Sequence, residues 1–177
     1  MAAQNASEKV LGVILLRKPK SLGRYDSWTA VLTGYRVIFA QMTSQMITDA
    51  AMQAKSQAKA EGRGFWGQWE EQLRATFTYT QKYLTMDPNA VLAETPGNFA
   101  VNNASISEVK LKLKDISRGG DVQQHEFELE VTSAQGKYEF RMEERDEFAN
   151  LLKQVYCERV KMPFGYLSSR GVRVKFL

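Results

Sequence analysis

Cysteine and histidine are almost absent from this sequence. Its 177 residues include one cysteine, Cys157, and one histidine, His125. A single cysteine excludes an internal disulfide and any metal site built on several thiolates. A single histidine removes most catalytic and metal-binding arrangements, which use several imidazoles together. We therefore expect no metal, no cofactor and a reducing, cytoplasmic setting.

Long apolar runs are also missing. The longest, Val10 to Leu16, is cut off by Arg17-Lys18-Pro19-Lys20, far short of the roughly 18 residues that a membrane-spanning helix needs. A signal peptide would carry its positive charge before the apolar run, not after it. The pattern predicts a cytoplasmic protein, with peripheral attachment to a membrane left open.

Catalytic motifs are lacking as well. The sequence has no P-loop, no nucleophile elbow and no pair of histidines. Its carboxylates fall on outward strand positions or at a helix start, whereas acid–base chemistry needs a carboxylate shielded in a cleft. We therefore predict that the protein is not an enzyme.

Charge is present but unevenly placed along the chain. Residues 1–42 hold six basic and two acidic side chains, and residues 159–177 hold five basic and none acidic. Residues 86–158 instead hold eight basic and fourteen acidic side chains. Basic ends around an acidic centre say more about partners than the net charge of +4 does.

Short apolar runs predict strands at the start of the chain. Residues 8–17 are rich in branched apolar residues and are bounded by Pro19, which favours a buried strand. Trp28–Thr33 and Tyr35–Ala40 are two further runs joined at Gly34, as in a β-hairpin.

Residues 43–85 change character and predict a helical insertion. In 43–61 the apolar side chains keep helical spacing, at Ile47, Ala50, Ala51, Ala54 and Ala58. A second stretch places Phe65, Trp69, Leu73 and Phe77 on one stripe, and we expect Pro88 to close the region.

Strands return after the insertion. Asn98–Asn102 is expected to be a short strand, and three runs then alternate: Ile106–Lys114, 125–133 and Lys137–Met142. In the first two runs the apolar face holds Val109, Leu111, Leu113, Phe127, Leu129 and Val131, and the other face holds Lys110, Lys112, Lys114, Glu126, Glu128 and Glu130. This alternation predicts an antiparallel meander with one face on a core.

The last predicted element is an amphipathic helix. Glu143, Glu144, Asp146 and Glu147 crowd its start, where carboxylates favour the helix dipole. Its apolar stripe is expected at Phe148, Leu151, Leu152 and Val155, and Pro163 is expected to end it.

Two segments resemble a known superfold. Val31-Leu-Thr-Gly-Tyr-Arg-Val-Ile-Phe39 is similar to the second-to-third strand hairpin of pleckstrin-homology-like (PH-like) domains of the GRAM-like and bacterial PH-like type. Tyr138–Met142, followed by Phe148, Leu151 and Leu152, resembles their last strand and closing helix. The resemblance implies an α+β, mainly β fold, in which a seven-stranded antiparallel sandwich or barrel is capped by a C-terminal helix.

The predicted organisation is a single domain over residues 1–177. Residues 8–42 and 98–160 would form the β core with its capping helix. Residues 43–85 would be the helical insertion after the third strand, and 161–177 a basic tail. The end of that tail, Arg170–Leu177, would add an edge strand, contact a partner or stay mobile.

Two groups of basic residues are candidate ligand sites. Lys110, Lys112 and Lys114 would bind phosphates on their own, but a paired neighbouring strand would turn them into an ion-pair ladder with its glutamates. Arg17, Lys18, Lys20 and Arg24 fall within eight residues with no acid among them. In phosphoinositide-binding PH domains the corresponding loop holds the headgroup, and an ordinary exposed basic loop is the alternative.

A candidate interface lies in the insertion. Phe65, Trp66 and Trp69 either form a docking or membrane-contacting surface or pack the insertion onto the sheet. The helix before them is thin in apolar residues, so a homodimer through residues 43–85 is an open alternative.

These observations together predict a non-catalytic binding module for an anionic lipid headgroup or a protein segment. The alternative is a structural or oligomerisation protein that uses the insertion as its interface. Nucleic-acid binding through the basic ends is weaker and not expected, because the net charge is small and no aromatic side chains accompany an obviously basic sheet.

Overall fold

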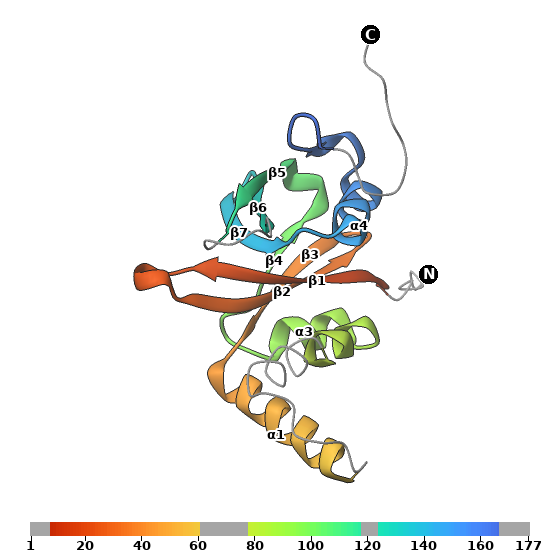
Figure 1. Cartoon of the computed structure of the whole chain (residues 1–177). Helices are drawn as coiled ribbons and strands as arrows, with labels where there is room; N and C mark the ends of the chain where they lie inside the picture. The colour runs from red at the N-terminus through yellow and green to blue at the C-terminus, as the bar shows by residue number, and fades with distance from the viewer. Residues whose placement is uncertain (1–7, 61–77, 118–123, 167–177) are drawn as a thin grey trace, which may run out of the picture. The chain divides into compact units, whose positions relative to one another are not determined.

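The computed structural model has a mixed α+β fold that is mainly β, as predicted (Figure 1). It describes residues 8–60, 78–117 and 124–166. The strands are β1 Val10–Pro19, β2 Tyr25–Thr33, β3 Arg36–Met42, β4 Phe99–Asn102, β5 Ile106–Asp115, β6 His125–Ser133, β7 Gly136–Glu143 and β8 Val160–Lys161. The α-helices are α1 Ser44–Ala60, α3 Pro88–Ala93 and α4 Asp146–Tyr156, and the short 3-10 helices are η1 Ser21–Gly23, η2 Lys82–Leu84, η3 Asn103–Ser105 and η4 Cys157–Arg159. The chain divides into two compact units, residues 1–100 and 101–177.

The first unit is built on strands in the order β4-β3-β2-β1. The predicted hairpin is confirmed, since β2 and β3 pair antiparallel with Val31 opposite Ile38. Strand β1 pairs antiparallel with β2 on its other side, with Val13 opposite Val31. The branched and aromatic residues that suggested strands therefore lie in register on neighbouring strands.

One face of this sheet carries a core cluster of Val10, Val13, Val31, Ile38, Ala40, Tyr83 and Val91. Tyr83 comes from η2 and Val91 from α3, so the end of the insertion and the segment after it cover this face (Figure 1). Residues of the opposite face are buried too, among them Ile14, Leu16 and Phe39. Strand β2 is accordingly buried without a break from Trp28 to Thr33, which explains why its sequence shows an apolar run rather than alternation.

The predicted helix in residues 43–61 is confirmed as α1, but the prediction for Pro88 is wrong. Pro88 does not close the helical region; it begins α3, where Asp87 caps the helix by accepting hydrogen bonds from Asn89 N–H and Ala90 N–H. Proline suits the first helical position because its missing N–H would have no partner there. The second predicted helical stretch, with Phe65, Trp69, Leu73 and Phe77, lies outside the described residues.

The second unit contains the predicted meander, in the order β7-β6-β5-β8. Leu111 pairs with Leu129, which in turn pairs with Phe140, so the apolar face is shared by three strands. Helix α4 contributes Ala149, Leu152 and Tyr156 to the buried residues. The stripe predicted at Phe148, Leu151, Leu152 and Val155 is thus rotated: Leu152 is buried and the other three are half-buried. Leu113 was expected in the core but is 40% exposed.

The end of the last helix differs from the prediction. Helix α4 stops at Tyr156, well before Pro163, because Cys157 adopts a positive φ of 52°. The Arg159 guanidinium then donates hydrogen bonds to the carbonyls of Asn103 and Ile106, at 2.6 and 2.8 Å. These bonds position β8, a short parallel strand beside β5 that the sequence did not predict. Of the predicted acidic helix start, Asp146 and Glu147 lie in the first turn, whereas Glu143 ends β7.

Candidate functional site

The hairpin of β1 and β2 extends beyond β3. The last pair between β2 and β3 is Ser27 with Met42, whereas β1 and β2 stay paired as far as Pro19 with Tyr25. At the turn, the N–H of Lys20 donates to the carbonyl of Arg24 at 2.8 Å and closes the loop around η1. Residues 17–26 therefore form a projecting two-stranded ribbon, which we call the basic tip (Figure 1).

The four predicted basic residues all lie on the basic tip. Arg17 and Lys18 are consecutive strand residues, so they point to opposite faces of the ribbon. The Arg17 guanidinium carbon lies 5.5 Å from the centre of the Tyr25 ring, and the Lys18 ammonium lies 5.8 Å from that of Trp28. Each cation therefore contacts an aromatic ring on its own face.

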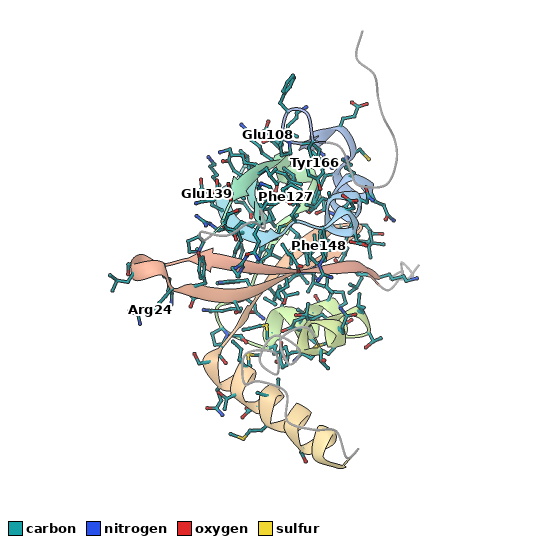
Figure 2. All side chains as sticks on the ribbon, in the orientation of Figure 1. Arg24, Glu108, Phe127, Glu139, Phe148 and Tyr166 are labelled. Carbon is teal, nitrogen blue, oxygen red and sulfur yellow. The ribbon has the colours of Figure 1, made fainter. Side chains whose placement is uncertain are left out.

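The remaining two cations lie at the turn. Lys20 forms an ion pair with Asp26 at 2.7 Å, and Figure 2 labels Arg24 at the outer end of the hairpin. The structure thus brings all four together on one projection but not into one pocket. Such an arrangement presents positive charge in several directions and suits an extended anionic surface better than a single phosphate group.

Leu22, at the apex of the basic tip, is a feature that the sequence reading missed. Its side chain is 88% exposed, and its backbone has φ 61° and ψ 32°. This left-handed conformation disfavours leucine and is usually taken by Gly, Asn or Asp. A signal was available, because leucine is an unusual residue between basic side chains in a predicted turn.

The lysines of β5 lie opposite glutamates of β6, as the predicted ion-pair ladder requires. Lys110, Lys112 and Lys114 pair in register with Glu130, Glu128 and Glu126 of β6. The ion pairs are Lys112–Glu130 at 3.3 Å, Lys114–Glu128 at 3.3 Å, Lys137–Glu130 at 2.9 Å, Arg141–Glu126 at 2.6 Å and Arg141–Glu128 at 3.4 Å. The hydrogen bond from Lys137 lowers the pKa of Glu130 below its usual range, with Lys112 adding to the effect. Lys112 and Lys114 thus each have an anionic partner on the β6 side of the strand.

A second polar cluster surrounds Glu94, beside α3. Its carboxylate accepts hydrogen bonds from the hydroxyls of Tyr79 and Tyr83, at 3.0 and 2.5 Å, and from the ammonium of Lys82. Burial alone would raise the pKa of Glu94, but these hydrogen bonds outweigh it and lower the pKa. Burial and the anionic Glu94 raise the pKa of Tyr83 far above its usual value. Because every donor already points at one carboxylate, the cluster anchors α3 to η2.

One glycine motif was overlooked in the sequence. Gly62, Gly64 and Gly67 have the spacing of a dinucleotide-binding loop, but that loop must follow a strand, whereas α1 precedes this one. The motif lies outside the described residues, as do Phe65, Trp66, Trp69 and the tail from residue 167.

Within the described residues, the His, Cys, Asp and Glu side chains form no group of three that could hold a metal ion. None of the helices in that part of the chain is both long enough and apolar enough to cross a membrane. Comparisons with protein-family models, curated proteins and solved structures gave no match to this chain.

Proposed function

We propose that this protein is a binding module that attaches to anionic membrane surfaces through the basic tip. The observation that carries the proposal is an almost fully exposed leucine, Leu22, surrounded by exposed Lys18, Lys20 and Arg24 on a projecting ribbon. Cations alone would suit any polyanion. Cations around an exposed apolar apex suit a surface that has anionic headgroups above an apolar layer.

The magnitudes support this combination. A Lys or Arg near an anionic leaflet contributes about 1 kcal/mol, and Asp26, the acidic residue within the tip, offsets part of that gain by pairing with Lys20. Moving a leucine side chain from water into an apolar layer contributes a further 1.5–3 kcal/mol, roughly. Tyr25, which is 44% exposed, adds an aromatic ring with a polar end of the kind found at membrane interfaces. The sum describes reversible, peripheral attachment.

We further infer that the fold is PH-like. Three early strands, a helical insertion, four later strands and helix α4 follow the order expected of that superfold, and this order supports the inference. The parallel β8 and the continuation of the insertion through α3 are departures from it.

Sedimentation with lipid vesicles tests the proposed function. We expect the chain to bind phosphatidylcholine vesicles that contain phosphatidylserine, to ignore vesicles of phosphatidylcholine alone, and to dissociate as salt rises. The variant K18Q/K20Q/R24Q should bind about a hundredfold more weakly, because three headgroup contacts are lost. The matched control K9Q/K153Q/K161Q removes the same charge from exposed positions elsewhere and should bind like the unmodified chain.

A second variant separates the apolar contribution from charge. Leu22→Asn removes the apolar side chain but tolerates the positive φ, so the turn is kept. We expect binding about tenfold weaker with unchanged thermal stability. If K18Q/K20Q/R24Q binds as tightly as the control, the proposed function is wrong. If Leu22→Asn has no effect while K18Q/K20Q/R24Q weakens binding, the membrane contact depends on charge alone. The proposal that the Leu22 side chain enters the apolar layer of the membrane is then wrong.

A further inference from the structure

Strand β5 has an edge that its neighbour covers only in part. The parallel strand β8 pairs with Val109 and Lys110, two of the ten residues of β5. Among the described residues, no strand pairs with the outer side of Leu111–Asp115. Such an edge turns alternate backbone N–H and C=O groups outward, ready to pair with an added strand.

The burial of side chains along the apolar face of β5 decreases toward the end of the strand. Val109, beside β8, is fully buried and Leu111 is 1% exposed, but Leu113 on the same face is 40% exposed. An added strand would therefore find an apolar contact at Leu113 in addition to backbone hydrogen bonds. The opposite face of the same stretch carries Lys112 and Lys114, which are also accessible.

The lysines decide what kind of strand fits. Among the described residues, Lys112 and Lys114 contact acidic side chains on the β6 side, at Glu130 and Glu128. Their other side faces the open edge, where opposite charges on a neighbouring strand are stabilising and like charges are destabilising. A second copy of β5 would set lysine beside lysine. The chain's own basic tail, with Arg170, Arg173 and Lys175, is disfavoured for the same reason.

We propose that the β5 edge at Leu111–Asp115 accepts an extended acidic segment of another protein as an added strand. Acidic side chains at alternate positions would lie beside Lys112 and Lys114. Apolar side chains between them would lie beside Leu111 and Leu113. This surface uses residues other than those of the basic tip, so it stands or falls independently of the proposed membrane attachment.

Peptide titration tests the proposal on the full chain. The probe is a fluorescently labelled peptide of alternating Glu and Val as long as β5, and fluorescence anisotropy measures its binding. The comparison peptides are alternating Lys and Val, and a peptide of the same Glu and Val composition in blocks. We expect only the alternating acidic peptide to bind, and to slow amide hydrogen exchange at Leu111–Asp115 when saturating.

Two variants test whether the acidic peptide binds beside Lys112 and Lys114. K112Q/K114Q should weaken acidic-peptide binding by about tenfold, since two cross-strand charge pairs are lost. K9Q/K153Q removes two exposed lysines outside the ladder of β5, β6 and β7 and should leave binding unchanged. Circular dichroism checks that both variants fold. Equal binding of the acidic and basic peptides, equal loss in the two variants, or unchanged amide exchange at Leu111–Asp115 would each overturn the proposal.

Discussion

The basic tip and the meander of β5, β6 and β7 contain the same kinds of side chain and use them differently. In the meander, each of Glu126, Glu128 and Glu130 forms at least one ion pair with a basic side chain of a neighbouring strand. On the basic tip, Asp26 is the single acidic residue among four basic ones. A lysine therefore becomes a structural or a binding residue according to the strand beside it and not according to its own type.

The two regions also differ in how much of the fold depends on them. Meander side chains that face away from the ladder are buried, among them Phe127, Leu129 and Phe140, whereas Leu22 at the apex of the tip is 88% exposed. A change in the meander is therefore expected to alter stability, and a change on the tip to alter binding.

The largest expected effect is at Phe127, which is fully buried and whose ring centre lies 5.2 Å from that of Tyr166 (Figure 2). Phe127→Ala should destabilise the protein by about 3–5 kcal/mol, because a large side chain leaves a cavity. Phe127→Leu, which keeps most of the volume, should cost below about 1.5 kcal/mol. On the tip, Leu22→Asn should change stability by less than about 0.5 kcal/mol. Urea denaturation measures all three, and similar losses for Phe127→Ala and Leu22→Asn would break the comparison.

A smaller effect with a defined pH dependence is expected at Glu94, a carboxylate in neither region. Its pKa in the folded state is lowered from the ordinary value of 4.5, so its contribution to stability is present above that value and is lost as the pH falls through the folded pKa. Glu94→Gln should cost about 1–3 kcal/mol at neutral pH, since three donors lose a charged acceptor. Thermal unfolding at neutral and at strongly acidic pH measures this difference. A loss that is the same at both pH values would contradict the assignment.

A last pair of variants compares a buried ion pair of the meander with an exposed one on the tip, where the smallest effect is expected. Glu126 is buried and accepts a hydrogen bond from Arg141 at 2.6 Å, so Glu126→Gln should cost about 1–3 kcal/mol. Lys20→Gln breaks the exposed pair with Asp26 on the tip and should cost below about 1 kcal/mol. Denaturation in low and high salt checks both, and equal costs would mean that burial does not separate the two regions.

Much of the fold could be read from local sequence patterns. Alternation in Ile106–Lys114 and 125–133 predicted β5 and β6, including the faces of their lysines and glutamates, because a strand turns successive side chains to opposite sides. Helical spacing predicted α1 in the same way. These patterns depend on backbone geometry that each segment adopts by itself.

Other features escaped because they depend on residues distant in the chain. Strand β8 is positioned by Arg159, which reaches the carbonyls of Asn103 and Ile106, more than fifty positions earlier. The Glu94 cluster joins residues of η2 and α3 that show no common motif. No periodicity within a segment reports such contacts.

The sequence by itself determined most of the strands and helices, the alternating lysines and glutamates of β5 and β6 and the four cations of the basic tip, since each follows from local residue order. Only the tertiary structure decided which lysines form ion pairs, because the strand register brings Lys112 and Lys114 to the glutamates of β6. It also decided that Leu22 is exposed at the apex of the tip and that, among the described strands, none pairs with the outer side of Leu111–Asp115. Exposure and pairing are properties of assembled strands, and these properties carry both proposals.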